Sequence, residues 1–400
     1  MKEKLMLRPG DTMTSEERMK AAIRLQVPDR VPAVPCVYYY FATYSGLSYA
    51  DLFEPKLYRR ATMKLFDELG PWDAYNFFHT YYRELASFFI PMVTMEPGFE
   101  LPRDIIRQFK EEEIMQPEDY AHIVEMSKRT PRLSFYRVMM DFMPRIYDYI
   151  QAGWRSYAFV LPRFAAQLAY YRYEFRDWFD RGATLFYSIG PVEVPFDTFS
   201  LARGLIPFVK DLSRFPGEIM KAAEALVPGY IFLIKATVNL FGIKRAMIDL
   251  HRSSNDFLSP DQFRRYALPS LKLLVDGLHD EGISVIMHCD GNWDMNLEAL
   301  RELPAGQCVI QLDGATDIFK AKEVIGDRMC IYGDVPASML ALGAPAEVDE
   351  YCHRLIEEVG RGGGFMLGTG CELAPNARAE NVKAMLDSVL KYGYYDRPEK

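Results

Sequence analysis

Three side chains of types that commonly bind metal ions follow apolar, strand-like runs in the second half of the sequence. His288 and Asp290 stand at the end of one run, and Cys371 stands at the end of another. Side chains alternate between the two faces of a strand, so His288 and Asp290 point the same way while Cys289 points to the opposite face. An imidazole, a carboxylate and a thiolate together suit a Zn²⁺-type ion. The spacing therefore predicts a metal site on His288, Asp290 and Cys371.

The same residues also fit a purely structural role. His288 would then be a hydrogen-bonded side chain inside the fold, and Cys371 would be a small buried one. A further polar pair, Asp249 and Arg252, follows an earlier strand-like run. These two side chains are candidates for orienting a substrate, but a structural ion pair explains them equally well. The sequence alone leaves both alternatives open.

The elements that must position these residues alternate between strand-like and helix-like segments. From residue 245 onward, five strand-like segments each end in a polar residue, which is typical of parallel strands with chemistry at their carboxyl ends. This pattern predicts a (β/α)8 barrel, the TIM-barrel fold, because an open sheet would gather its site at one switch point. The five polar ends are Asp249, Asp290, Asp313, Asp334 and the pair of Cys371 and Glu372.

The whole chain, residues 1–400, is predicted to form a single barrel domain with an N-terminal extension. Thr14 and Glu17 have the spacing of a helix capping box. The β-branched and aromatic run Cys36–Phe41 predicts the first barrel strand. Residues 80–182 contain aromatic, helix-compatible segments that are broken by prolines. We expect this region to be a helical insertion or cap over one end of the barrel.

Composition and charge narrow the class of protein. The 47 Lys and Arg against 55 Asp and Glu leave a net charge of −8, which disfavours binding to nucleic acid. The sequence has no run of about 18 apolar residues and no signal-peptide core near its N-terminus, so no membrane association is expected. Six cysteines without a CxxC pair indicate reduced thiols and a cytoplasmic protein.

The motifs at both ends of the chain resemble those of the uroporphyrinogen decarboxylase superfamily, which includes that decarboxylase and corrinoid-dependent methyltransferases. The N-terminal part of the resemblance comprises Thr14–Arg18 and Pro28–Pro32. The C-terminal part is more specific, and it comprises Tyr332–Pro336, Gly368–Leu373 and Glu380–Val382 in the expected order. The resemblance implies the same barrel fold.

Within that superfamily, the methylcobalamin:coenzyme M methyltransferases carry a zinc motif of His-x-Cys followed by a distant Cys. On this chain the motif falls on His288, Asp290 and Cys371, with a carboxylate where the first thiolate is expected. A ligand set with one nitrogen, one oxygen and one sulfur is better suited to polarising an oxygen than to activating a thiol. The resemblance therefore implies Zn²⁺ as a Lewis acid.

The implied activity is that of a corrinoid-dependent methyltransferase, which moves a methyl group from an aryl methyl ether to Co(I) of a separate corrinoid protein. Such a reaction needs an electrophile at the ether oxygen and apolar walls around the ring. Asp313 and Glu372 are then expected to support the metal or to act as general acid. Tyr38 and Tyr40 are expected to line the substrate site together with Asp249 and Arg252. Ordinary core packing explains the two tyrosine rings equally well.

Other functions remain open at this stage. One is a methylcobalamin:thiol methyltransferase with an altered zinc site. Another is a metal-free decarboxylase, but the arginines that bind the substrate carboxylates in the decarboxylase branch are absent from the matching stretch Cys36–Ala42. A non-enzymatic scaffold is a third alternative, because a fold does not determine a function. A homodimer is compatible with each of them.

Overall fold

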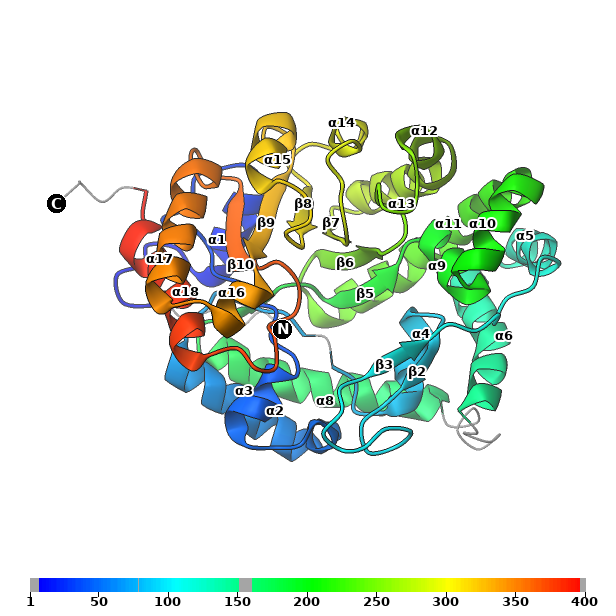
Figure 1. The fold of residues 1–400 in the computed structure, drawn as a ribbon. Coiled ribbons are helices and arrows are strands. Elements are labelled where there is room, and N and C mark those ends of the chain that lie inside the picture. The colour runs from blue at the N-terminus through cyan, green and yellow to red at the C-terminus, as the bar shows by residue number, and fades with distance from the viewer. Residues whose placement is uncertain (1–6, 78, 151–159, 396–400) are drawn as a thin grey trace.

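A computed structural model describes residues 7–77, 79–150 and 160–395 of the chain, and it has a parallel barrel with helices around it (Figure 1). Six parallel strands form the larger part of the barrel, in the spatial order β5-β6-β7-β8-β9-β10. Their bounds are β5 (Ile189–Glu193), β6 (Arg245–Leu250), β7 (Ser284–Cys289), β8 (Cys308–Leu312), β9 (Cys330–Val335) and β10 (Phe365–Thr369).

Short segments from the first half of the chain close this sheet into a barrel. Ala33 forms a parallel bridge with Leu367 on β10, and the amide of Asp73 donates a hydrogen bond to the carbonyl of Ala33. Asp73 immediately precedes β1 (Ala74–Tyr75), which pairs with β4 (Thr184–Leu185). Because β4 leads directly into β5, the ring of hydrogen-bonded strands is complete. The predicted (β/α)8 barrel is confirmed.

The first barrel strand lies earlier in the chain than the sequence predicts. Its bridge is at Ala33, whereas the chain turns at Tyr38 and Tyr39 and begins helix α2 (Tyr40–Ser45) at Tyr40. The prediction of a strand over Cys36–Phe41 is therefore wrong. The aromatic residues of this run belong to the turn and the helix, and their rings are buried in the core. Core packing rather than strand pairing therefore explains why the run is rich in aromatic residues.

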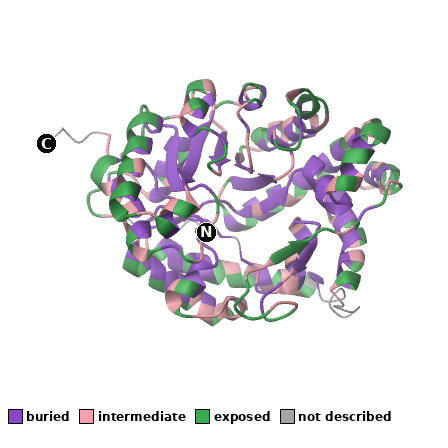
Figure 2. Cartoon of the chain, in the orientation of Figure 1, coloured by how far each residue is buried: buried purple, intermediate pink, exposed green. Residues whose placement is uncertain are grey.

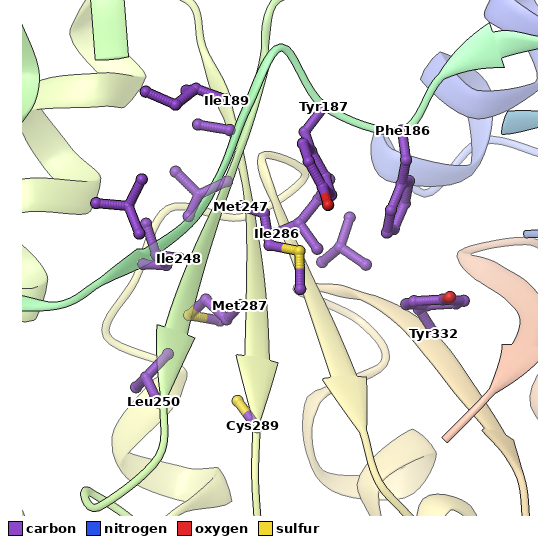
Figure 3. Close-up of a cluster of buried hydrophobic side chains, with 14 of the residues drawn as sticks. Phe186, Tyr187, Ile189, Met247, Ile248, Leu250, Ile286, Met287, Cys289 and Tyr332 are labelled. Atoms are coloured by element: carbon purple, nitrogen blue, oxygen red, sulfur yellow. The ribbon is translucent and has the colours of Figure 1, made fainter. Parts of the chain in front are cut away.

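The interior of the barrel is filled by apolar and aromatic side chains. Figure 3 shows buried residues of β6 and β7, among them Met247 and Ile286, together with the rings of Phe186 and Tyr187, which lie between β4 and β5, and of Tyr332 on β9. The rings of Phe186 and Tyr332 meet edge to face with centroids 5.0 Å apart. Both faces of these strands are buried, because helices cover the outside, and this explains their nearly continuous apolar sequences.

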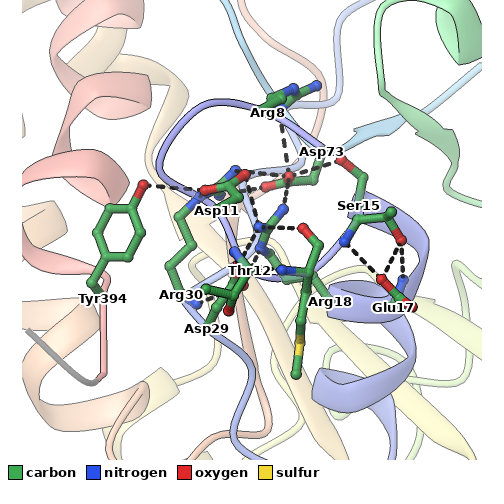
Figure 4. A network of polar contacts seen from close by, with 12 residues as sticks. Arg8, Asp11, Thr12, Ser15, Glu17, Arg18, Asp29, Arg30, Asp73 and Tyr394 are labelled. Atoms are coloured by element: carbon green, nitrogen blue, oxygen red, sulfur yellow. Dashed lines mark hydrogen bonds and ion pairs between the residues drawn. The ribbon is translucent and has the colours of Figure 1, made fainter. Parts of the chain in front are cut away.

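The N-terminal extension is attached to the amino-terminal end of the barrel by a buried ionic network. Helix α1 (Ser15–Ile23) begins with the predicted capping box between Thr14 and Glu17. The fully buried carboxylate of Asp73 accepts hydrogen bonds from Arg18 and Arg30, each at 2.7 Å (Figure 4). The motifs at residues 14–18 and 28–32 therefore position the extension, and they lie at the barrel end away from the strand carboxyl ends.

The region between β1 and β4 is a mixture of helices and a hairpin. The antiparallel strands β2 (Val93–Met95) and β3 (Gln108–Lys110) form the hairpin. Helices α5 (Asp119–Arg129) and α6 (Ser134–Tyr149) pack against the outer helix α11 (Pro216–Phe241). Helix α8 (Val160–Asp180) leads back to β4 and packs against it. Residues around the hairpin, among them Met92, Ile106 and Phe109, line a cavity together with residues at the carboxyl ends of the barrel strands. This part of the region therefore covers that end of the barrel.

Helix α11 (Pro216–Phe241) is long and apolar enough, by length and composition alone, to cross a membrane. It packs against α5, α6 and α13 (Leu268–Asp280), and its residues Ile219, Leu226 and Ile234 are completely buried. These contacts make it a core helix of the shell around the barrel. Buried and exposed positions alternate along the outer helices in the same way (Figure 2). The other α-helices of the described residues are α3 (Pro55–Leu69), α4 (Ala86–Phe89), α9 (Pro195–Arg203), α10 (Leu205–Arg214), α12 (Pro260–Gln262), α14 (Leu297–Leu300), α15 (Ile318–Ile325), α16 (Ala337–Leu342), α17 (Pro345–Arg354) and α18 (Ala379–Tyr392).

Candidate metal centre

A row of polar side chains crosses four neighbouring strands near their carboxyl ends. Glu193 on β5 is paired with Asp249 on β6, Asp249 with His288 on β7, and His288 with Gln311 on β8. Paired residues of parallel strands point to the same face, so the four side chains share the inside of the barrel. All four residues are buried. Polar groups at this depth need partners, and this row is therefore the natural place for chemistry.

The three ligands predicted from the sequence come together at this row. Nε2 of His288 lies 2.9 Å from Oδ1 of Asp290 and 3.8 Å from Sγ of Cys371. Ligand atoms about 2.0–2.3 Å from a tetrahedral Zn²⁺ stand roughly 3.3–3.7 Å apart, so small shifts suffice for all three to reach one ion. Cys289 is completely buried and does not line the cavity at this site, as the alternation along the strand predicts. The donor set fits a zinc ion.

Strong electrostatic coupling holds His288 and Asp290 together. Burial alone would lower the pKa of His288, but the adjacent carboxylate of Asp290 raises that pKa well above its ordinary value. Burial would likewise raise the pKa of Asp290, but the His288 imidazolium lowers it to about 2. Without a metal the two side chains form an ion pair, and a metal ion would displace the imidazolium proton.

A second cluster, which we name the Glu193 cluster, lies beside the first and consists of Glu193, Asp249 and His251. Nδ1 of His251 lies 2.8 Å from Oε1 of Glu193, and Nε2 of the same ring lies 3.3 Å from Oδ2 of Asp290. One ligand-type atom from each member of the cluster lies within 4.8 Å of the others. Burial raises the pKa of Asp249 to about 7, although the imidazoles of His251 and His288 oppose the shift.

The sequence analysis missed two members of the Glu193 cluster. His251 stands two residues after Asp249, which is the same i to i+2 spacing that identified His288 and Asp290. This spacing was a usable signal. Glu193 had no such signal in the sequence, because it ends a strand, IGPVE, that is interrupted by Gly and Pro. Only the pairing of β5 with β6 brings Glu193 next to Asp249.

A cavity of about 430 Å³ is lined by the three predicted ligands and by Asp249 and His251 of the Glu193 cluster. Its lining includes Tyr38, Asp249 and Arg252, three of the four residues predicted to bind substrate. The fourth, Tyr40, is buried on α2 next to Tyr44 and is not part of the lining. The other walls are mainly apolar and aromatic, with contributions from the turn after the first strand and from the hairpin region; they include Tyr39, Ile90, Met92, Ile106, Phe109 and Phe257.

The two residues predicted to assist the metal have different positions. Asp313 does not line the cavity, and its carboxylate accepts hydrogen bonds from the amides of Gly291 and Ala315 at 2.8 and 2.9 Å. It therefore shapes the loop that follows Asp290. Glu372 lines the cavity beside Cys371, and removal from water raises its pKa to about 7, against the opposing charge of Arg107.

Arg252 and Arg107 carry positive charge to the edge of the same cavity. Arg252 is paired with Glu111 and donates to the carbonyl of Ser200 at 2.9 Å. Arg107 is paired with Glu96 at 2.6 Å and lies over the ring of Tyr38. Both guanidinium groups are thus held in place by carboxylates of their own.

The family of the chain follows from comparison with known proteins. A family model described as uroporphyrinogen decarboxylase (URO-D) matches residues 188–392, which is more than half of the 400 residues. The chain belongs to the uroporphyrinogen decarboxylase family. The matched region contains both clusters described above.

Individual relatives match over a smaller region. The uroporphyrinogen decarboxylase of Syntrophotalea carbinolica is 31% identical over 133 residues, which cover 33% of this chain and 37% of that protein. The enzyme of the same name from Pseudoalteromonas atlantica is 28% identical over 142 residues, which cover 34% of this chain and 38% of that protein. The matches thus span well under half of the length of these relatives.

A solved structure of a methyltransferase from Methanosarcina mazei shares the fold along almost the whole chain. The two structures superpose with a TM-score of 0.66, covering 95% of this chain and 99% of the other, at 17% sequence identity. This similarity supports the barrel fold for the region before residue 188 as well. Together the comparisons indicate an enzyme of the uroporphyrinogen decarboxylase type or the methyltransferase type.

Proposed function

We propose that this protein is a corrinoid-dependent methyltransferase that demethylates an aryl methyl ether. The observation that carries the proposal is the convergence of His288, Asp290 and Cys371 beside an aromatic-walled cavity. A nitrogen, oxygen and sulfur ligand set at the mouth of a barrel suits a catalytic zinc ion with an open position. The metal, its substrate and a separate corrinoid protein are all parts of this proposal, as is a cytoplasmic location.

The chemistry requires help at the ether oxygen. In the reaction, the electron pair of Co(I) forms the new bond to the methyl carbon, and the pair of the broken C–O bond goes to oxygen. Zinc would supply Lewis acidity that stabilises the charge developing on that oxygen. Glu372 lines the cavity next to Cys371 and is positioned to give the phenolate its proton. The product then leaves as a neutral phenol, and its proton comes from Glu372 in the same cavity.

The cavity walls favour an aromatic substrate. Tyr38, Tyr39 and Phe109 line the cavity and offer apolar surfaces for a ring; the two tyrosines are buried, whereas Phe109 is 45% exposed. Arg107 and Arg252 stand at the edge of the cavity, where a ring substituent such as a carboxylate or hydroxyl would meet positive charge. We therefore expect methoxylated phenols or benzoates as methyl donors.

The test uses the zinc-loaded protein with a reduced corrinoid and a panel of methoxylated phenols and benzoates. We expect the hydroxylated product and methylcobalamin in equal amounts. The rate should fall about 10²-fold or more in His288→Ala, since the loss of an electrophile forfeits several kcal/mol of transition-state stabilisation. If no ether reacts but methylcobalamin methylates a thiol, the protein is a thiol methyltransferase. If carboxylic acids lose CO₂ without metal, it is a decarboxylase.

A further inference from the structure

The Glu193 cluster has the composition and burial of a second cation site. Glu193 ends β5, and Asp249 and His251 lie at the end of β6, so all three side chains converge from two paired strands. Their ligand-type atoms lie within 4.8 Å of one another. None of the three belongs to the ligand set of His288, Asp290 and Cys371. Asp249 and His251 line the same cavity as that ligand set, so two separate groups of ligand-type residues lie side by side.

An unpaired buried carboxylate oxygen points to a missing positive charge. Asp249 is 2% exposed, and its Oδ1 has no hydrogen-bond partner among the described residues. Glu193, its neighbour across the strands, is 0% exposed. Burying a carboxylate is unfavourable unless its charge and its lone pairs find partners. A cation between these two carboxylates would satisfy both.

The positively charged groups that line the cavity are already engaged with other carboxylates. Apart from His251, the cavity lining has three of them within the described residues. Arg107 pairs with Glu96, Arg252 with Glu111, and His288 with Asp290. This leaves one imidazole, His251, to face both Glu193 and Asp249. The cluster therefore offers two carboxylates and one imidazole, a ligand set that suits a divalent ion.

The two nitrogens of His251 are directed at different partners. Nδ1 faces the carboxylate of Glu193, and Nε2 faces Oδ2 of Asp290 at 3.3 Å. If the proton is on Nε2 and donated to Asp290, the lone pair of Nδ1 is available to an ion between Glu193 and Asp249. Histidines that bind metals usually donate their other N–H to a carboxylate in this way. His251 would thus bind one ion and orient a ligand of the other.

We propose that Glu193, Asp249 and Nδ1 of His251 bind a second divalent cation beside the zinc site. Two carboxylates and one imidazole form a harder ligand set than one that contains a thiolate, so this site should accept Mn²⁺ while the Cys371 site prefers Zn²⁺. The second ion would hold His251, and through it Asp290, in a fixed orientation. The inference rests on the Glu193 cluster itself and requires no particular substrate or reaction.

The test measures Mn²⁺ binding by electron paramagnetic resonance on protein that was first loaded with one equivalent of Zn²⁺. We expect one further Mn²⁺ per chain in the unmodified protein. The isosteric variants Glu193→Gln and Asp249→Asn should bind Mn²⁺ at least tenfold more weakly and keep their zinc. Glu111→Gln, which removes the exposed carboxylate that pairs with Arg252, is the matched control and should bind Mn²⁺ normally.

Two results would overturn the proposal. One is the absence of Mn²⁺ binding by the zinc-loaded, unmodified protein, which does not depend on the folding of any variant. The other is unchanged Mn²⁺ affinity in both Glu193→Gln and Asp249→Asn. Methyl transfer is not measured, so a failure of the proposed reaction leaves this test intact. His288→Ala separates the two sites further, because it should lose zinc and retain Mn²⁺.

Discussion

Sγ of Cys371 lies 3.8 Å from Nε2 of His288, and this contact connects the ends of β10 and β7. Two strands, β8 and β9, stand between them in the sheet. An ion bound by both residues would therefore link opposite parts of the barrel mouth. Such a link stabilises the folded state in proportion to the binding free energy of the ion.

Zinc should accordingly raise the stability of the protein. At a free zinc concentration 100-fold above the dissociation constant, we expect an increase of about 3 kcal/mol in the free energy of unfolding. His288→Ala and Cys371→Ala should lose this increase, since each removes one of three ligands. Thermal unfolding with and without zinc, together with elemental analysis, checks the prediction. Equal zinc-dependent shifts in the unmodified protein and both variants would place the ion elsewhere.

Cys289 provides a control for the direction of side chains on β7. It is buried and faces away from the cavity, so Cys289→Ala should retain zinc and activity. The small cavity that the change leaves should cost about 1–2 kcal/mol of stability. Zinc content and unfolding by urea measure the two effects. Loss of zinc from Cys289→Ala would show that the sulfur of this residue, and not the side chain of His288 or Asp290, faces the metal.

Of the two tyrosines predicted to bind substrate, only Tyr38 lines the cavity. Tyr38 forms part of the wall, whereas Tyr40 packs next to Tyr44 on α2. Tyr38→Leu should raise KM for an aryl methyl ether several-fold, because an aromatic contact is worth about 1 kcal/mol beyond its area. Tyr40→Phe should leave KM unchanged. Steady-state kinetics on both variants test this, and an equal effect of the two changes would argue against the wall as the substrate site.

The N-terminal network should be essential for stability. Asp73 is fully buried and accepts hydrogen bonds from Arg18 and Arg30. Asp73→Ala would leave buried guanidinium groups without their common partner, at a cost of about 3–5 kcal/mol. Urea unfolding gives the value, and Thr14→Ala at the N-cap of the same helix, expected to cost about 1 kcal/mol, is the comparison. A similar small effect of both changes would contradict this prediction.

Glu16 should make stability depend on pH in the acidic range. Burial opposes its ionisation, but the Arg245 guanidinium lowers the pKa of Glu16 from 4.5 to about 2. The lowered folded-state pKa contributes about 3 kcal/mol, fully present above pH 4.5 and lost as the pH falls towards 2. The difference in unfolding free energy between the unmodified protein and Glu16→Gln should therefore shrink between about pH 5 and pH 3. Urea titrations at several pH values measure it, and a difference that is constant over this range would count against the ion pair.

The sequence alone was sufficient to predict the barrel class and one of the two clusters. Strand-like runs that end in polar residues indicate parallel strands. Both faces of such strands are buried, so polar side chains are found mainly at the strand ends. The i to i+2 relation of His288 and Asp290 follows from the geometry of a strand, and so does the opposite direction of Cys289. These features are local, and local geometry is what a sequence pattern encodes.

Tertiary structure decided what depends on contacts between distant segments. The first strand is at Ala33 rather than at Cys36–Phe41, because packing of the aromatic rings outweighed their preference for strands. Glu193 joins Asp249 only through the pairing of β5 with β6, and Tyr38 rather than Tyr40 reaches the cavity because the chain turns between strand and helix. Strand register and the direction of a turn depend on which surfaces meet in the folded chain, and no single segment contains that information.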